Sequence, residues 1–129
     1  KELADRILAK VNSSNYGRFS VLANWKFNIE KVIDIKPNSF LPKPKVFSSL
    51  LIFNPKHPLI NFKNPENLEY VTKIFFNQRR KKIKKPINVL FKNSLDISKK
   101  FNLNLDLRPQ NISPDIFYKL AKEYENLRS

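Results

Sequence analysis

Residues 113–127 read SPDIFYKLAKEYENL, and this stretch decides the fold of the second half of the chain. Ser113 followed by Pro114 is typical of a helix N-cap and a first-turn proline. The apolar side chains behind them recur at the spacing of one helix face: Ile116, Phe117, Leu120, Ala121, Tyr124 and Leu127. The stretch therefore predicts an amphipathic helix with that face in a core.

An earlier stretch repeats the same signal, because Asn64 directly precedes Pro65. Three apolar residues follow at helical spacing: Leu68, Val71 and Phe75. We expect this helix to run as far as Pro86, since proline is poorly tolerated inside a helix. A further helix is expected over residues 87–95. Residues 57–129 are accordingly interpreted as a small all-α domain.

A turn divides two short helical patterns near the start of the chain. The helices are expected over residues 1–11 and 19–25, with Trp25 on the apolar face of the second. In the turn between them, over residues 13–18, Gly17 is the one residue free to take a positive φ without steric strain. Trp25 is interpreted as a core residue rather than as part of a site.

Two strands are expected after these helices. Apolar and polar residues alternate over 27–36, with an interruption at Lys31. Residues 46–53 are apolar on both faces at their end, which is typical of a strand inside a covered sheet. Two strands do not make a stable sheet alone, and the chain contains no Met, so we interpret it as part of a longer protein. The expected fold is an α/β fragment over residues 1–56 followed by the all-α domain.

The composition excludes several classes of function. One Gly rules out a Gly-rich phosphate loop, and no Cys with a single His rules out an all-protein zinc site, a thiol nucleophile and disulfides. The longest apolar run, residues 50–53, is far shorter than the ~20 residues of a membrane span. The chain has 25 Lys and Arg residues and 11 acidic residues, which gives a formal charge of +14. The expected partner is a polyanion, nucleic acid first and an anionic membrane surface second.

The charge is concentrated in residues 78–85, QRRKKIKK, where every residue from Arg79 to Lys85 except Ile83 is a cation. On a helix these cations would point in all directions, so they cannot form one solvated face. Favourable interaction with a helix dipole would account for one or two of them. We interpret the run as a nucleic-acid contact, and the alternative is a solvated helix end.

A second candidate lies in the loop 39–45, SFLPKPK, where Phe40 precedes alternating prolines and lysines. An aromatic side chain on a stiff, basic loop suits stacking on an unpaired base. The residues alone favour the other interpretation, in which Phe40 pins the loop to the core. His57, beside a proline in a linker, is expected to be solvated, and Glu2 with Asp5 carries no acid–base signal.

Four segments, in this order, resemble the ribosomal RNA adenine dimethyltransferase family. They are KELADRI with YGRFSV (1–7 and 16–21), PNSFLPKPKV with SS (37–46 and 48–49), FFNQRRK (75–81) and RPQNIS (108–113). The resemblance implies that residues 1–56 are the last strands and helices of a Rossmann-like methyltransferase domain. It implies that residues 57–129 are a helical RNA-binding domain.

The resemblance also implies an activity. Family members move two methyl groups from S-adenosylmethionine onto the exocyclic amine of each of two adjacent adenosines, in a hairpin near the 3′ end of small-subunit 16S ribosomal RNA. The implied protein is a cytoplasmic monomer that acts on the assembling 30S particle in ribosome biogenesis, without a membrane partner. The family's Gly-rich cofactor loop and Asn-Leu-Pro-Tyr motif precede these segments, so the S-adenosylmethionine site is expected upstream of Lys1.

Position by position, the resemblance assigns roles to named residues. Phe40 matches the loop aromatic that stacks on the flipped adenine, which reverses the preference for a core role. The residues expected to contact RNA are Arg79, Arg80, Lys81, Lys82, Arg108 and Lys43. Pro86 departs from the family pattern, because it is expected to break or kink the helix after the basic run. The alternative function is a non-enzymatic RNA-binding or ribosome-assembly module, which explains the charge but not the first two segments.

Overall fold

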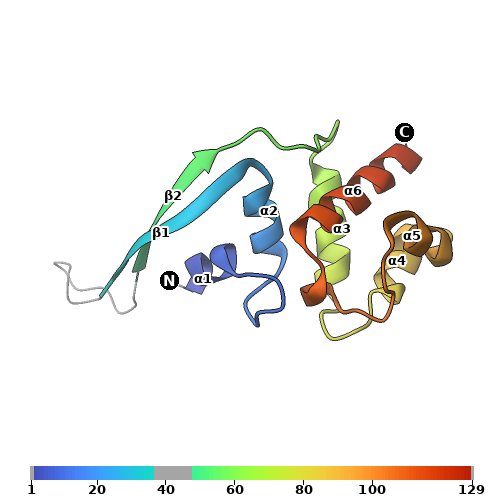
Figure 1. Cartoon of the computed structure of the whole chain (residues 1–129), viewed down its shortest axis with the longest axis horizontal. Coiled ribbons are helices and arrows are strands. Elements are labelled where there is room, and N and C mark those ends of the chain that lie inside the picture. The colour runs from blue at the N-terminus through green and yellow to red at the C-terminus, as the bar shows by residue number, and fades with distance from the viewer. Residues whose placement is uncertain (1, 37–47, 129) are drawn as a thin grey trace.

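The computed structural model describes residues 2–36 and 48–128, which form a helical body with a projecting two-stranded ribbon (Figure 1). The elements in chain order are α1 (Glu2–Leu8), α2 (Arg18–Lys26), β1 (Phe27–Ile35), β2 (Ser48–Pro55), α3 (Glu66–Phe76), α4 (Lys84–Leu90), α5 (Ser94–Phe101), the 3-10 helix η2 (Pro109–Asn111) and α6 (Pro114–Arg128). No helix within the described ranges is both long and apolar enough to span a membrane.

Helices α3 and α6 pack against each other at the centre of the body, and both begin where the sequence predicts. The Asn64 side chain accepts a hydrogen bond from the Glu66 backbone N–H (3.1 Å), as expected of a cap. Phe75 of α3 meets Phe117 of α6 edge to face, with ring centroids 5.2 Å apart. The predicted inward residues of both helices are buried or partly buried, except Leu127, which is exposed.

The core continues across the predicted boundary at residues 56 and 57. Helix α2 packs on α3 and α6, and Val21 is fully buried in the same apolar cluster as Phe75. Trp25 packs at the edge of that cluster, as predicted, and its indole N–H donates to the Ile60 carbonyl (2.8 Å). The two predicted units therefore share one core, on which both halves of the chain depend.

The ribbon consists of β1 and β2 in antiparallel pairing, from Phe27 opposite Pro55 to Ile35 opposite Ser48. The register shifts between Lys31 and Ile33, where the sequence pattern is interrupted. β2 starts at Ser48 and continues to Pro55, two residues beyond the predicted end, while residues 46 and 47 lie outside the described part. Among the described residues the sheet has these two strands alone, and the expectation that it is covered within a larger sheet stays a prediction. Several large apolar side chains of the ribbon are exposed: Val32, Ile33, Leu50, Ile52 and Phe53.

The prediction of one helix from residue 65 to Pro86 is wrong. α3 ends at Phe76, and Pro86 lies instead in the first turn of α4, where its missing N–H leaves no helical hydrogen bond unmade. The helix expected over 87–95 thus begins and ends earlier. A separate helix, α5, starts after Asn93, whose side-chain oxygen accepts from the Leu95 and Asp96 backbone N–H groups (3.0 and 3.3 Å).

Gly17 also differs from the expectation, because its φ is −170°, an extended value open to any residue. The positive φ values occur at Asn12 (75°) and Asn102 (50°), and asparagine tolerates this conformation better than most side chains. Asn102 ends α5, and Asn12 follows α1 at the start of the turn. The φ of Gly17 therefore does not require a glycine, and a Cβ atom at this position would be in ordinary van der Waals contact with the Arg79 side chain.

Candidate nucleic-acid interface

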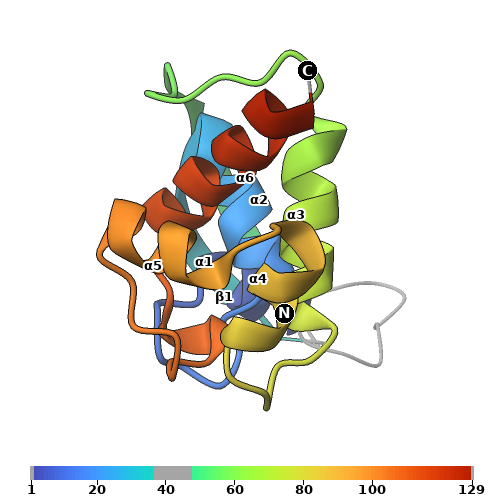
Figure 2. The same ribbon diagram turned by 90° about the vertical axis from the view of Figure 1, so that its right-hand side faces the viewer.

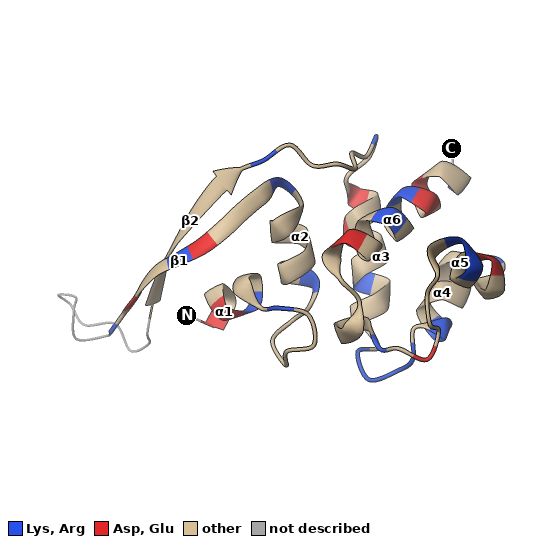
Figure 3. Ribbon diagram, in the orientation of Figure 1, with Lys and Arg blue, Asp and Glu red and all other residues tan. Residues whose placement is uncertain are grey.

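The basic run lies in the connection from α3 to α4 and in the first turn of α4, not along a helix (Figure 3). The sequence-based expectation that these cations surround a helix is therefore wrong. The run still holds six cations within seven residues. Five of the six cations are exposed: Arg80, Lys81, Lys82, Lys84 and Lys85. We call these five residues the basic loop. Arg79 is half-buried and behaves differently.

The backbone of the basic loop is held in place by a buried isoleucine. The Ile83 side chain is fully buried in the core cluster, and its backbone N–H donates to the Leu107 carbonyl (2.7 Å). The next N–H, of Lys84, donates to the Leu105 carbonyl (3.3 Å). Lys82 forms an ion pair with Asp106 (3.3 Å), but both side chains are largely exposed and add little stability. The loop thus presents its charges from a fixed backbone.

Arg79 is used inside the protein. Its Nη2 donates to the backbone carbonyls of Ser14 (2.7 Å) and Ser13 (3.4 Å). A Cβ atom built on Gly17 would lie 3.4 Å from Arg79 Nη1, so the guanidinium packs directly over this glycine. The turn before α2 is therefore fastened to the start of the basic loop by one side chain. The predicted contact of Arg79 with RNA stays a prediction.

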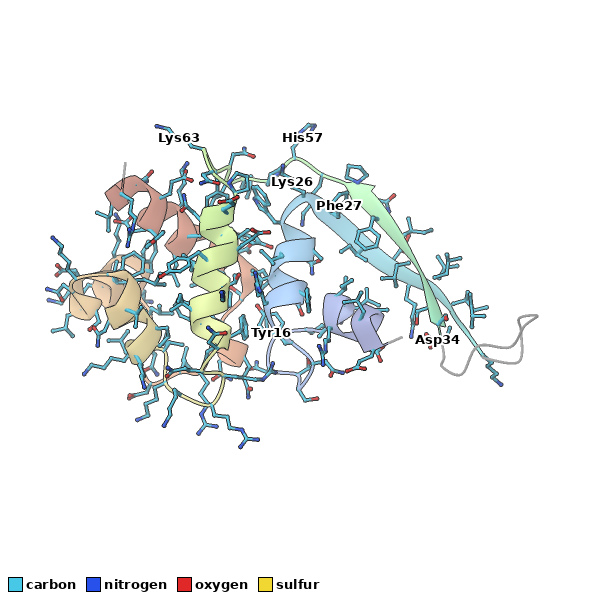
Figure 4. The ribbon with its side chains drawn as sticks, turned by 180° about the vertical axis from the view of Figure 1, so that it is seen from behind. Tyr16, Lys26, Phe27, Asp34, His57 and Lys63 are labelled. Carbon is cyan, nitrogen blue, oxygen red and sulfur yellow. The ribbon has the colours of Figure 1, made fainter. Side chains whose placement is uncertain are left out.

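The same turn is fastened on its other side by the segment before α6. The Asn12 backbone N–H donates to the Gln110 carbonyl (2.8 Å), and Asn111 Nδ2 donates to Asn12 Oδ1 (2.8 Å). The buried Tyr16 hydroxyl donates to the Ile112 carbonyl (2.6 Å), and Figure 4 shows Tyr16 near the end of α3 that leads into the basic loop. Three of the segments that carry the family resemblance thus meet at one junction.

The other predicted site residues are placed less directly. Arg108 is exposed at the start of the segment that holds the turn, and its backbone N–H donates to Asn111 Oδ1 (2.9 Å). Phe40 and Lys43 lie outside the described residues. The ends of β1 and β2 that flank them are at the tip of the ribbon, far from the basic loop (Figure 1). His57 is exposed, as predicted.

The run 78–85, interpreted from the sequence as a nucleic-acid contact, already includes Lys84 and Lys85, whereas the RNA contacts named residue by residue end at Lys82. The hollow beside these lysines was not predicted. In the structure Lys84 and Lys85 line a depression of about 570 Å³ together with Lys81, Lys82, Asn88 and Val89. The signal for this hollow is Pro86, because a proline is tolerated in the first turn of a helix and so indicates that α4 begins near Lys84.

The buried ionisable groups of the body are structural. The Glu125 carboxylate accepts hydrogen bonds from the backbone N–H groups of Lys63 (2.9 Å) and Asn64 (3.0 Å) and from Asn67 Nδ2 (2.8 Å). Burial tends to raise the pKa of Glu125, but these bonds and the nearby Lys122 ammonium outweigh it and lower the pKa to about 2. Burial raises the pKa of the Tyr16 and Tyr118 hydroxyls, so both remain protonated donors.

Comparison with known proteins places the chain in a family. The family described as "Ribosomal RNA adenine dimethylase" matches residues 1–126. The ribosomal RNA small subunit methyltransferase A of Pelagibacter ubique is 56% identical over 128 residues, which is 99% of this chain and 49% of the relative. The protein of the same name from Prochlorococcus marinus is 37% identical over 95% of this chain and 46% of its own length. The chain spans about half the length of these curated relatives.

Solved structures share the fold. A dimethyladenosine transferase from Plasmodium falciparum superimposes with a TM-score of 0.80 at 24% identity, covering 98% of this chain and 55% of that one. The 23S rRNA methyltransferase ErmE gives a TM-score of 0.57 at 18% identity over 86% of this chain and 46% of its own. At these identities the likeness is one of fold. Together with the family match over residues 1–126, the curated relatives show that this chain belongs to the ribosomal RNA adenine dimethylase family.

Proposed function

We propose that this chain is part of an rRNA adenine N6,N6-dimethyltransferase and supplies its RNA-binding surface. The observation that carries the proposal is the basic loop, whose five exposed cations stand on a fixed backbone in a chain of this family. Phosphate contacts from such side chains provide most of the affinity of a protein for nucleic acid. The proposed target is a hairpin near the 3′ end of 16S rRNA, with two adjacent adenosines, in the assembling 30S particle.

The methyl donor in this proposal is S-adenosylmethionine, whose sulfonium supplies an electrophilic methyl group when bound. The described residues do not fit a site for it. The only glycine in the sequence, Gly17, begins helix α2 under the Arg79 guanidinium rather than forming a Gly-rich loop after a strand. We propose that the donor site and the Asn-Leu-Pro-Tyr motif lie in sequence upstream of Lys1, as the family resemblance implies.

This chain's own contribution is to hold the RNA and to present the base. Phe40 is proposed to stack on the flipped adenine, which keeps the exocyclic amine out of the helix stack. Residues 1–56 are proposed to end a Rossmann-like domain, and the exposed apolar residues of the ribbon support this, because such a surface is expected to be covered. Residues 57–129 are the proposed RNA-binding domain. The protein is proposed to work as a cytoplasmic monomer without a membrane partner.

A salt titration tests the RNA-binding surface. In the protein that carries this chain, Lys81, Lys84 and Lys85 are changed together to Ala, and binding to the 16S hairpin is measured at three or more salt concentrations. Each lost phosphate contact should reduce the slope of log affinity against log salt by about 0.7–0.9. The matched control changes Lys10, Lys99 and Lys119, which are also exposed but lie elsewhere. Equal slopes for both triple variants would contradict the proposal.

A product assay separates the enzyme from the alternative, a non-enzymatic RNA-binding or assembly module. The full protein is incubated with S-adenosylmethionine and 30S particles that lack the modification, and the RNA nucleosides are analysed by mass spectrometry. Dimethyladenosine at two adjacent positions supports the enzyme. RNA binding with the expected salt slope but no methylated adenosine would favour the module.

A further inference from the structure

A second, larger groove lies on the face formed by α4, α5 and α6, which Figure 2 turns toward the viewer. It encloses about 830 Å³, within the ~300–1,000 Å³ typical of ligand pockets. Phe91, Ile97 and Tyr124 contribute its floor, each only 5% exposed. Its lips carry Val89 of α4 and Leu127 of α6, which are 60% and 65% exposed. The groove therefore has exposed aliphatic side chains at its edges and largely buried aromatic and aliphatic side chains beneath them.

This groove is continuous with the depression in the basic loop. Asn88 and Val89 of α4 line both hollows, so one surface runs from the four lysines over α4 into the groove. If a strand of nucleic acid binds to the lysines through its phosphates, its next nucleotide would therefore reach the groove. Adjacent phosphate and base sites are the usual arrangement for unpaired nucleotides, with cations along the backbone and apolar rings under the bases.

The polar groups of the groove suit a base better than a phosphate. The charged residues that line it are Lys92, Asp96, Lys100, Glu123 and Arg128, so two carboxylates lie among its three cations. Glu123 is paired with Lys100 (2.7 Å), and the Arg128 guanidinium carbon lies 4.6 Å from the centre of the Tyr124 ring. A guanidinium against an aromatic ring offers a flat surface, and bases stack on both kinds of group. The amides of Asn88 and Asn93 add neutral polar groups that can pair with a base edge.

We propose that this groove binds an unpaired base of the RNA whose phosphates lie on the basic loop. The inference rests on the proposed function and names a second contact for the same substrate. The continuity with the lysines and the excess of positive charge favour RNA over a protein segment as the occupant. The site would let the protein recognise a single-stranded position of the RNA, which phosphate contacts alone do not do.

The test removes the apolar lips without touching the core. Val89→Ser with Leu127→Ser is compared with Leu95→Ser, since Leu95 is 63% exposed on α5 but does not line the groove. The lip variant should weaken binding of the full protein to the 16S hairpin about five- to tenfold, the lower part of the range for one stacked base. Its salt slope should equal that of the wild type, because no phosphate contact is lost. Leu95→Ser should bind like the wild type.

Abasic RNA identifies the occupant. A photoreactive phenylalanine at residue 127 first crosslinks to the nucleotide in the groove, and that nucleotide is then made abasic. The lip variant and the wild type should bind the abasic RNA equally.

Two outcomes would assign the groove to another partner and overturn the inference. In the first, the lip variant loses the same affinity for intact and abasic RNA; in the second, it loses affinity only for the whole particle. If the lip variant binds with wild-type affinity while the Lys81, Lys84 and Lys85 triple variant has a reduced salt slope, the inference fails and the proposed function stands. If that triple variant keeps the wild-type salt slope, the proposed function fails.

Discussion

Replacing Arg79 by alanine should weaken the fold more than it weakens RNA binding. The change removes two hydrogen bonds from Nη2 to backbone carbonyls and the packing of the guanidinium over Gly17. A hydrogen bond to a charged group contributes about 1.5–3 kcal/mol. The bond to Ser13 is long at 3.4 Å and the site is half-exposed, so we expect a loss of about 1–2 kcal/mol in total.

Arg80 provides the matched control, because it is the same residue type one position along and its side chain is exposed. Arg79→Ala should lower the melting temperature by about 4–8 °C, taking about 4 °C per kcal/mol for a domain of this size. Arg80→Ala should leave the melt unchanged and reduce the salt slope of RNA binding by about 0.7–0.9. Arg79→Lys should melt like Arg79→Ala, since an ammonium lacks the planar fork that serves both the carbonyls and the glycine.

Hydrogen exchange gives a local measurement in the same variants. The backbone N–H groups of Asn12 and Tyr16 belong to the turn that Arg79 holds, and they should exchange faster in Arg79→Ala than in Arg80→Ala. The reasoning is refuted if both variants melt and exchange like the wild type and lose the same salt slope. Arg79 would then act on RNA as its neighbour does.

Three further predictions concern other residues. Phe40→Ala in the full enzyme should lower methyl transfer by the equivalent of about 1–3 kcal/mol while binding to the 30S particle changes little, and equal losses in both assays would return Phe40 to a core role. Glu125→Gln should destabilise the fold by about 2 kcal/mol at pH 7 in urea melts, because a buried carboxylate loses its charge-assisted bonds. The folded pKa of Glu125 lies below its ordinary value of 4.5, so this stability is present above pH 4.5 and is lost as the pH falls toward about 2; a variant with the wild-type pH profile would contradict the assignment. This chain by itself should give no saturable heat with S-adenosylmethionine in calorimetry, and a micromolar isotherm would place a donor site within it.

The parts of the fold that could be predicted are those whose signal is local. The apolar period of α6 and the proline that opens it lie within a few residues, so both the helix and its start were predicted correctly. The end of α3 was not predicted correctly. It depends on the Ile83 side chain entering the core and on the Ile83 backbone N–H donating to the Leu107 carbonyl, and this contact joins distant segments. α5 was missed because its helix is short and Asn93 was assigned to the preceding one.

In the candidate site, too, local features could be predicted from the sequence and contacts between distant segments could not. The charge of the basic loop is a property of composition and was evident from the sequence, and the structure leaves all five of its cations exposed. Their contact with RNA stays a prediction. The internal role of Arg79 was not predictable, because its partners are backbone carbonyls that every residue has, 65 and 66 positions away. Gly17 was interpreted through its φ, whereas the structure relates it to the guanidinium packed above it.

The two buried tyrosines have a consequence for proteolysis. Tyr16 donates from the first half of the chain to Ile112 in the second, and Tyr118 donates from the second half to the Val21 carbonyl in the first (2.6 Å). The connection between the halves runs over the surface, with Leu59 fully exposed, and exposed connections are where proteases cut. A protein nicked there should stay in one piece on a sizing column and separate only in denaturant, with both fragments unfolding in a single step.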